Sequence, residues 1–406
     1  MEVYLDNAAT TRVYDAVIDT VVQAMRTDYG NPASLHTKGV DAERYIRSAR
    51  ETLAGLLKVP PAELVFTSGG SESNNMAIIG AAMANARAGR HIITSQIEHA
   101  SVYETMKYLE QQDFEVTYLP TDKYGVVDLE ALRAAVRPDT ILVSVMTVNN
   151  EIGTIQPLED IARIVKEINP QTLLHTDAVQ GFGKIPVYPK RIGLDMFSAS
   201  GHKFHGPKGV GFLWIRDKVK VRPMVYGGGQ QKGRRSGTEN VPGTAGMGKA
   251  AEIEFENFEE KCAQLYALRS YFIEEIEKID GTKVNGGRLP GSLSLQGRED
   301  PAACAAPHIV SVSFEDVRAE VLLHALEERG VYVSSGSACS SNHPAVSRTL
   351  KSIGLEKKYL DATLRFSFSQ DTSRQELEEC IRVLNELLPV LRRFTPGGRG
   401  KGKRHV

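Results

Sequence analysis

Cysteine is scarce in this sequence: there are four in 406 residues, and they lie far apart in the chain. No two form a Cys-x-x-Cys pair, which excludes the usual zinc or iron–sulfur motif supplied by one chain, and we expect no metal site. The same scarcity excludes a disulfide framework and favours a reducing compartment. The four are Cys262, Cys304, Cys339 and Cys380.

Long apolar runs and an excess of one charge are missing as well. No stretch of about 18 apolar residues would span a membrane, and the N-terminus, Met-Glu-Val-Tyr-Leu-Asp, has no features of a signal peptide. The formal net charge is -1, so no global field attracts nucleic acid or an acidic membrane. We therefore expect a cytoplasmic protein with neither a membrane nor a nucleic acid as partner.

Strand and helix patterns alternate along most of the chain, with a helix expected to begin near Met76 after the strand Leu64 to Thr67. This alternation predicts an α/β fold with a mostly parallel central sheet flanked by helices. In such sheets, functional sites collect at the carboxyl ends of the strands. Thr67, His99, Asn150 and Asp177 all lie at or just past such ends.

The length favours more than one domain. We expect a large domain over residues 16–255 and a smaller α+β domain that combines 1–15 with 256–395. A helical region from about Gly243 to Ile279 is expected to connect them, and residues 286–307, rich in Gly, Pro, Ala and Ser, are expected to be a poorly structured insertion. The basic tail, 396–406, is expected to be disordered; a solvated end is the simpler interpretation, and contact with RNA or an acidic partner is the alternative.

One lysine, Lys203, has unusual neighbours: Ser-Ala-Ser-Gly-His precedes it, and Gly-Pro-Lys-Gly follows shortly after it. A surface lysine is the ordinary interpretation, but surface lysines are seldom enclosed by such turn-forming residues. A lysine in a tight, partly desolvated turn is suited to forming a Schiff base with a carbonyl cofactor. Pyridoxal phosphate (PLP) is such a cofactor, and it also needs a phosphate cradle and an acid opposite its ring nitrogen.

The chain offers candidates for both groups. The turn Ser68 to Asn75 joins a strand to a helix, an arrangement that directs free backbone N–H groups at an anion; a helix cap by Ser71 or Ser73 is the alternative. Asp177 ends a strand, where it is suited either to pairing with a protonated pyridine nitrogen or to capping a helix. The residues proposed to hold the phosphate are Gly70, Ser71, Ser200 and His202.

Two further residues stand out. Cys339 lies in a loop of Ser, Gly, Ala and Asn, which suits an exposed and mobile thiol, whereas Cys262 and Cys380 are predicted to be core residues on amphipathic helices. Arg365 interrupts a strand pattern. It is either part of a structural ion pair or a bidentate clamp for a substrate carboxylate.

Taken together, these segments resemble the cysteine desulfurases, in the class V aminotransferase branch of PLP fold type I. The resemblance covers nearly the whole chain. The matching segments are Leu5–Thr11, Gly30–Pro32, Thr67–Asn74, Glu98–His99, Val148–Gly153, Asp177–Gln180, Ser200–Lys203, Gly206–Gly209, Arg235–Asn240, Ser335–Cys339 and Leu364–Ser367.

The resemblance implies a role for each site residue. Lys203 would be the Schiff-base lysine, Asp177 the partner of the pyridine nitrogen, Gln180 the contact of the ring hydroxyl and His99 the group stacked on the ring. The remaining roles follow in the same way: Gly70, Ser71, Ser200 and His202 would hold the phosphate, Thr238 would reach it from the second subunit of a homodimer, Asn150 and Arg365 would hold the substrate carboxylate, and Cys339 would carry a persulfide.

The implied reaction converts L-cysteine to L-alanine and passes sulfur to an acceptor protein, either an iron–sulfur scaffold or a tRNA thiolation enzyme. Some positions depart from the family, which usually has Asn where His308 and Ser311 stand and lacks about twenty residues between Gly287 and Pro307. These departures leave the acceptor open. The alternatives are a selenocysteine or cysteine sulfinate lyase, a PLP-binding interaction platform without turnover, and a dinucleotide-binding oxidoreductase, which the absence of Gly-x-Gly-x-x-Gly disfavours.

Overall fold

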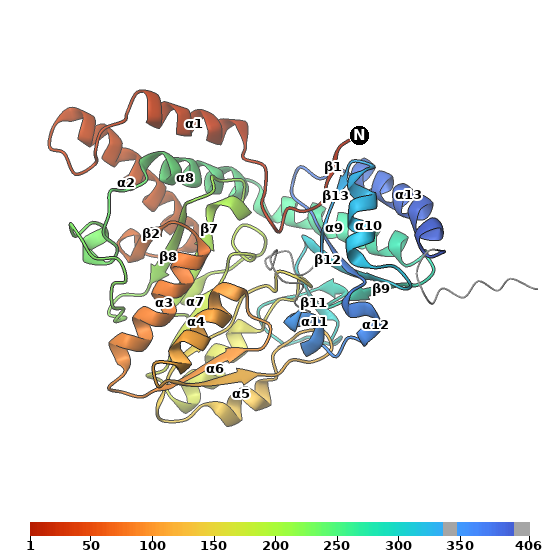
Figure 1. Ribbon diagram of the computed structural model, residues 1–406. Helices are drawn as coiled ribbons and strands as arrows, with labels where there is room; N and C mark the ends of the chain where they lie inside the picture. Colours follow the sequence, from red (N-terminus) through yellow and green to blue (C-terminus); the bar gives the residue numbers. More distant parts are fainter. Residues whose placement is uncertain (336–346, 394–406) are drawn as a thin grey trace, which may run out of the picture.

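A seven-stranded sheet forms the centre of the larger part of the chain (Figure 1). The structure, a computed structural model, describes residues 1–335 and 347–393. The strand order is β2-β8-β7-β6-β5-β3-β4, and only β8 runs against its two neighbours. The strands are β2 (Leu64–Thr67), β3 (His91–Ser95), β4 (Glu115–Leu119), β5 (Thr140–Ser144), β6 (Leu173–Asp177), β7 (Met196–Ser200) and β8 (Gly211–Ile215). The mostly parallel sheet predicted from the sequence is therefore confirmed.

Helices cover both faces of this sheet, because five of its strands are buried along their whole length and need apolar partners on each side. One face packs against α3 (Gly70–Asn85) and α4 (Ala100–Glu110). The other packs against α2 (Thr37–Leu57), α5 (Leu129–Ala135), α6 (Leu158–Ile168) and α8 (Val241–Phe255). The outer helix α1 (Asp15–Arg26) lies along α8, and α7 (Pro189–Ile192) follows β6. We call this assembly the large lobe.

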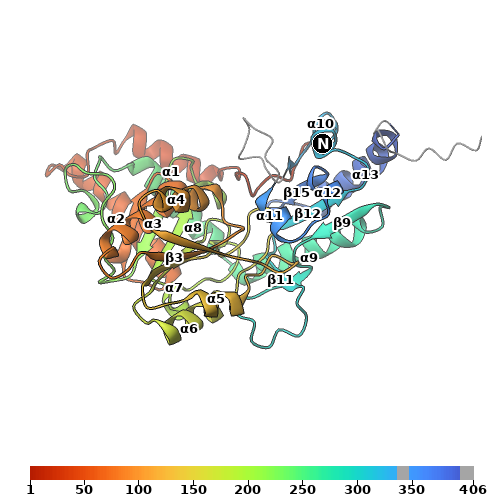
Figure 2. The ribbon, with the colours of Figure 1, turned by 60° about the horizontal axis from the view of Figure 1, so that its bottom comes forward.

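A second antiparallel sheet, in the order β14-β15-β12-β9, has its own hydrophobic core and lies beside the large lobe (Figure 2). Its strands are β9 (Thr282–Asn285), β12 (Ile309–Phe314), β14 (Ser334–Ser335) and β15 (Thr363–Ser367). The helices of this small lobe are α9 (Phe258–Ile276), α10 (Ala319–Glu327), α11 (Arg348–Ser352), α12 (Lys357–Leu360) and α13 (Arg374–Leu391). At the start of the chain, β1 (Val3–Tyr4) pairs with β13 (Val331–Tyr332) in this lobe. The residue boundaries of the two expected domains stay a prediction.

Three segments differ in detail from what the sequence predicts. The helix after β2 begins at Gly70, not near Met76, because burial against the sheet outweighs the weak helix propensity of its Gly, Ser and Asn residues. The helical region expected from 243 to 279 is present, but it is divided into two helices, α8 and α9, separated at Asn257, whose φ of +50° is left-handed. The insertion contains two short paired strands, β10 (Leu289–Pro290) and β11 (Ala303–Ala305).

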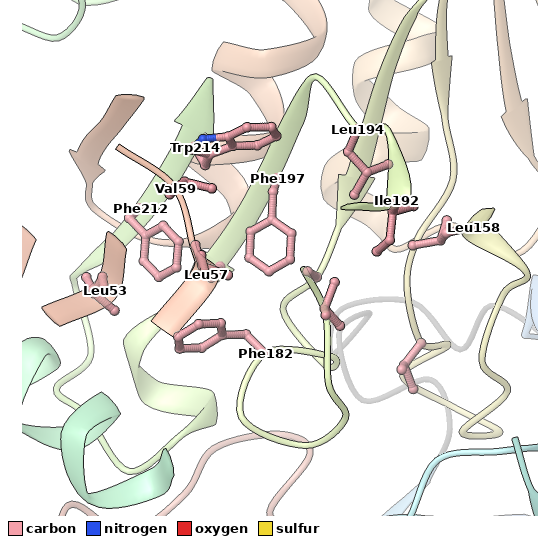
Figure 3. Close-up of a cluster of buried hydrophobic side chains, with 14 of the residues drawn as sticks. Leu53, Leu57, Val59, Leu158, Phe182, Ile192, Leu194, Phe197, Phe212 and Trp214 are labelled. Carbon is pink, nitrogen blue, oxygen red and sulfur yellow. The ribbon is translucent and has the colours of Figure 1, made fainter. Parts of the chain in front are cut away.

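An aromatic cluster in the large lobe supports the turn after β7 (Figure 3). Phe182 packs edge-on against Phe197 of β7, with ring centroids 6.2 Å apart, and against Phe212 of β8 at 5.3 Å. It also contacts the buried ring of Phe204 at 4.9 Å. Phe204 directly follows Lys203 in sequence, so this cluster fixes the backbone that carries the lysine. No helix in the described part of the chain is long and apolar enough to cross a membrane.

Candidate active site

A cavity of about 320 Å³ lies at the carboxyl ends of the central strands. Ten of the twelve site residues predicted from the sequence line this cavity: Gly70, Ser71, His99, Asn150, Asp177, Gln180, Ser200, His202, Lys203 and Arg365. These residues come from both lobes and from segments as far apart as α3 and β15. The fold therefore brings together side chains that no local pattern relates to one another.

Lys203 ends a short 3₁₀ turn, Gly201–Lys203, that follows β7. Its Nζ donates hydrogen bonds of 2.7 Å to the backbone oxygens of both Ala8 and Ala9. The N-terminal segment is held there by Thr11, whose backbone N–H and hydroxyl both donate to the carbonyl of His202, at 2.9 and 3.0 Å. The first residues of the chain thus lie over the lysine. Ala8 and Ala9 form part of the cavity wall, and the amine of Lys203 points toward their carbonyl groups.

Asp177 is almost fully buried at the end of β6. Its Oδ1 accepts the backbone N–H of Val179 at 3.0 Å, and its Oδ2 accepts a hydrogen bond of 2.7 Å from Nδ2 of Asn74. No regular helix begins at this position; a turn follows, so Asp177 does not cap a helix. A carboxylate that lines the cavity in this way is suited to pairing with a cationic group.

The start of α3 forms a concave turn beside Ser200. The residue before the helix is Gly69, with φ +150° and no side-chain cap, so neither Ser71 nor Ser73 caps it; the hydroxyl of Ser73 instead lies 2.7 Å from that of Thr67. A Cβ on Gly70 would lie 2.6 Å from a methyl group of Val179, so only glycine fits there. Such a helix start presents backbone N–H groups to an anion.

His202 lies beside this turn, with Nδ1 3.2 Å from the hydroxyl of Thr10. Burial, together with the positive charges of Lys203 and Lys208, lowers the pKa of His202 to about 4. His202 is therefore neutral at physiological pH. A neutral imidazole can donate one N–H without opposing the ionisation of neighbouring groups.

Gln180 lies on the wall nearest the N-terminal segment, where its Nε2 donates to the carbonyl of Ala8 at 2.8 Å. Its Oε1 lies 3.3 Å from Nε2 of His308, the residue immediately before β12. His308 is fully buried, and burial together with nearby cations holds its pKa well below the ordinary histidine value. Gln180 is thus fixed between the two lobes.

Arg365 projects from β15 and is buried. Its Nη1 donates to the backbone oxygen of Asn150 at 2.8 Å, and its Nη2 pairs with Oδ1 of Asp6 at 2.9 Å. The structural ion pair considered from the sequence is therefore present. The guanidinium also lines the cavity, where it is available to a carboxylate ligand.

Two predicted site residues are not brought to the cavity of this chain. Thr238 is exposed and does not line it. Cys339 and the basic tail lie outside the residues that the structure describes.

The other three cysteines are poor nucleophiles. Cys304 and Cys380 are buried, and Cys262 is half-buried rather than a core residue as predicted. Burial raises the pKa of Cys262 and of Cys304 to about 11 and raises that of Cys380 further. All three thiols therefore stay protonated at physiological pH, and a thiol is a weak nucleophile.

Some cavity residues were missed by the sequence reasoning. Asn74 bonds Asp177 and Ser101, and Ser101 bonds His99. Asn74 lies within the Ser-rich segment already singled out, four residues after Gly70, and this place in the segment was a signal. Ala8, Ala9, Val148 and Val179 likewise lie within matching segments, whereas Ser101 and Met146 carry no local signal. The missed lining residues are Ala8, Ala9, Asn74, Ser101, Met146, Val148 and Val179. Among the residues described, no three His, Cys, Asp or Glu side chains are grouped as metal ligands.

Comparison with known proteins gives consistent matches over nearly the whole chain. The model of the aminotransferase class-V family matches residues 3–380. A cysteine desulfurase IscS from Methanosarcina thermophila is 43% identical over 394 residues, which cover 97% of this chain and 94% of that protein. A solved structure of a NifS-like protein superposes with a TM-score of 0.88 at 40% identity and covers 96% of this chain and 100% of its own. The structure of SspA in complex with cysteine gives a TM-score of 0.77 at 34% identity, covering 90% and 98%.

Proposed function

The chain belongs to the aminotransferase class-V family, and from this premise we propose that it is a PLP-dependent cysteine desulfurase. Relatives that it matches over nearly their full length carry that name. The observation that carries the proposal is the shared cavity of Lys203, Asp177 and Arg365. It combines an amine, a buried carboxylate and a guanidinium, which are the groups that an aldehyde cofactor and an amino acid substrate require.

The residues present fit the cofactor. The N-terminus of α3, where a Cβ on Gly70 would not fit, offers backbone N–H groups for the phosphate. Ser71, Ser200 and His202 line the same cavity and would complete the cradle. When bound, PLP supplies an electron sink for the electron pair left by a departing Cα proton. Asp177 would hold the protonated ring nitrogen, since two hydrogen bonds, from Asn74 and from the backbone of Val179, fix its carboxyl group at the cavity.

Lys203 would hold the cofactor through its amine and, once freed by the amino group of the substrate, would take the proton from Cα. His99 would stack on the ring and Gln180 would contact the ring hydroxyl. Asn150 and Arg365 would orient the substrate by its carboxylate, because both line the cavity. A bidentate guanidinium fixes a carboxylate in direction as well as in position.

Cys339 would take the sulfur. Its thiolate would attack the sulfur atom of the substrate, so that the Cβ–S bond breaks and an S–S bond forms on Cys339. The electron pair of the broken bond stays with the carbon skeleton, which takes up protons and leaves as L-alanine. The persulfide would then pass to an acceptor protein, an iron–sulfur scaffold or a tRNA thiolation enzyme, in the cytoplasm.

A homodimer is part of the proposal. Thr238, expected at the phosphate, does not line the cavity of its own chain, so it would act on that of a second copy. Large apolar side chains are exposed on α1, on the loop between α1 and α2, and on the loop before Thr238, and they support such an interface: Met25, Tyr29, Leu35, Met224 and Tyr226. Exposed apolar side chains of this size are typical of surfaces covered by a partner.

The test is to supply the purified protein with PLP and then with L-cysteine, and to measure the cofactor absorbance and the alanine released. We expect a coloured protein and one alanine per sulfur transferred to a thiol acceptor. A protein that stays colourless contradicts the proposal. The rate of alanine release is also measured with selenocysteine and with cysteine sulfinate as substrates. Comparison with the rate on L-cysteine distinguishes the desulfurase from the two related lyases.

A further inference from the structure

Asn74 connects two parts of the cavity, the end of β6 with Asp177 and the start of α4 with Ser101 and His99. It is fully buried on α3, and its Nδ2 lies 2.7 Å from Oδ2 of Asp177 and 2.9 Å from the hydroxyl oxygen of Ser101. A carboxylate only accepts hydrogen bonds, so the amide must turn its NH₂ group toward Asp177. Its Oδ1 is then buried without a hydrogen-bond partner among the described residues. Buried amides are rarely left half-satisfied, which indicates that the contact with Asp177 dictates this orientation.

The other end of this connection is His99. His99 is the N-cap of α4, and its Nδ1 accepts the backbone N–H of Ser101 at 3.1 Å. A nitrogen that accepts a hydrogen bond carries no proton, so the neutral ring has its proton on Nε2. The hydroxyl of Ser101 lies 2.9 Å from the same Nδ1. It therefore donates to His99 while it accepts from Asn74, and the hydrogen bonds run in one direction from Asn74 to His99.

We propose that Asn74 and Ser101 are positioning residues that set Asp177 and His99 as one unit beside the cofactor site. The proposal rests on the proposed function, since it concerns how the chain holds PLP. Asn74 holds the carboxylate of Asp177 in the direction of the ring nitrogen, and through Ser101 it fixes the orientation and tautomer of His99. Three helix and strand ends, those of α3, α4 and β6, supply the four side chains.

The experiment measures PLP binding rather than turnover. Apoprotein of Asn74→Leu, Ser101→Ala and the double variant is titrated with PLP, and the circular dichroism of the bound cofactor is recorded. We expect the dissociation constant to rise about tenfold or more in Asn74→Leu, which removes a hydrogen bond to a charged group, and about threefold in Ser101→Ala. Because the groups act as a unit, the dissociation constant of the double variant for PLP should be no higher than that of Asn74→Leu alone. The dichroism band should change in all three.

Thr105→Val is the matched control. Thr105 lies one turn after Ser101 on α4 and is buried. Its hydroxyl donates to the backbone oxygen of Ser101 at 2.8 Å, outside the cavity. It should bind PLP as the wild type does, with the same dichroism. If Asn74→Leu fails to fold, Asn74→Ala replaces it, and Ser101→Ala alone remains decisive.

Two results overturn the proposal: wild-type PLP affinity and an unchanged dichroism band in Ser101→Ala, or independent, multiplying losses in the double variant. A wild-type protein that binds no PLP is a different failure, because it contradicts the proposed function itself.

Discussion

Arg365 and Asp6 form an ion pair of 2.9 Å although they come from opposite ends of the chain. The pair fixes the guanidinium at the cavity, where it is proposed to bind the substrate carboxylate. Arg365→Lys keeps the charge but loses the planar fork. We expect the KM for L-cysteine to rise about tenfold to a hundredfold, the effect of losing one hydrogen bond to a charged group. Steady-state kinetics check this, with the exposed Arg382→Lys as control; an unchanged KM would contradict the role.

Lys203→Ala removes the only amine that the cavity lining offers to an aldehyde within the described part of the chain. We expect the variant to lose the Schiff-base absorbance of bound PLP while it keeps its fold. The spectrum of the dialysed protein is the measurement. Lys208→Ala, an exposed lysine five residues further along, should keep the absorbance. Retention of the band in Lys203→Ala would mean that another residue holds the cofactor.

Cys339→Ala should abolish sulfur transfer without affecting the binding of PLP. The variant is expected to bind PLP with the wild-type spectrum and to form no protein persulfide, which mass spectrometry after incubation with L-cysteine detects. Cys262→Ala is the control, since burial raises the pKa of that thiol to about 11 and keeps it protonated. Full turnover by Cys339→Ala with a thiol reductant would show that the sulfur leaves by another route.

Lys203, Asp177 and the turn before Gly70 could be predicted because each lies at or just past the end of a strand, within a short, recognisable segment. The parallel sheet then places all of these ends at one edge. The connection from Asn74 to Ser101 could not be predicted, because the two residues lie on separate helices and only the packing of α3 on α4 brings them within hydrogen-bond distance.

The errors in the helix boundaries have similar causes. Helix α3 begins among Gly, Ser and Asn residues because it is buried, which a propensity scale does not contain. The break at Asn257 depends on one left-handed residue, and asparagine tolerates that conformation without signalling it. The insertion gains structure by packing: Asp160 of α6 accepts the backbone N–H of Leu295 at 2.7 Å.

The buried ion pair of Lys184 and Glu254 gives a prediction about stability. Tyr14 donates to Oε2 of Glu254 at 3.1 Å and stacks on His205, with ring centroids 4.1 Å apart. Lys184→Met leaves a buried carboxylate without its cation, so the free energy of unfolding should fall by about 3 to 5 kcal/mol. Urea unfolding measures it. Lys184→Met combined with Glu254→Leu should recover much of the loss, and additive losses would show that the charges do not interact.

The buried carboxyl group of Glu98 should make the free energy of unfolding depend on pH. The side chain is buried at the end of the β3 segment; it accepts the hydroxyl of Ser95 at 2.6 Å and the backbone N–H of Met146 at 3.0 Å. Burial, and to a smaller extent the charge of Asp177, raises the pKa of Glu98 to about 8, although these two hydrogen bonds lower it.

The folded state therefore binds a proton that the unfolded state releases above its ordinary pKa of about 4.3. Between these two values the free energy of unfolding should decrease as the pH rises, because the folded state holds more protons. Glu98→Gln mimics the protonated form and should flatten this part of the curve, whereas Glu104→Gln, at an exposed position of α4, should leave it unchanged. Urea unfolding from pH 5 to pH 8 at constant ionic strength tests this; a slope that persists in Glu98→Gln would assign it to another group.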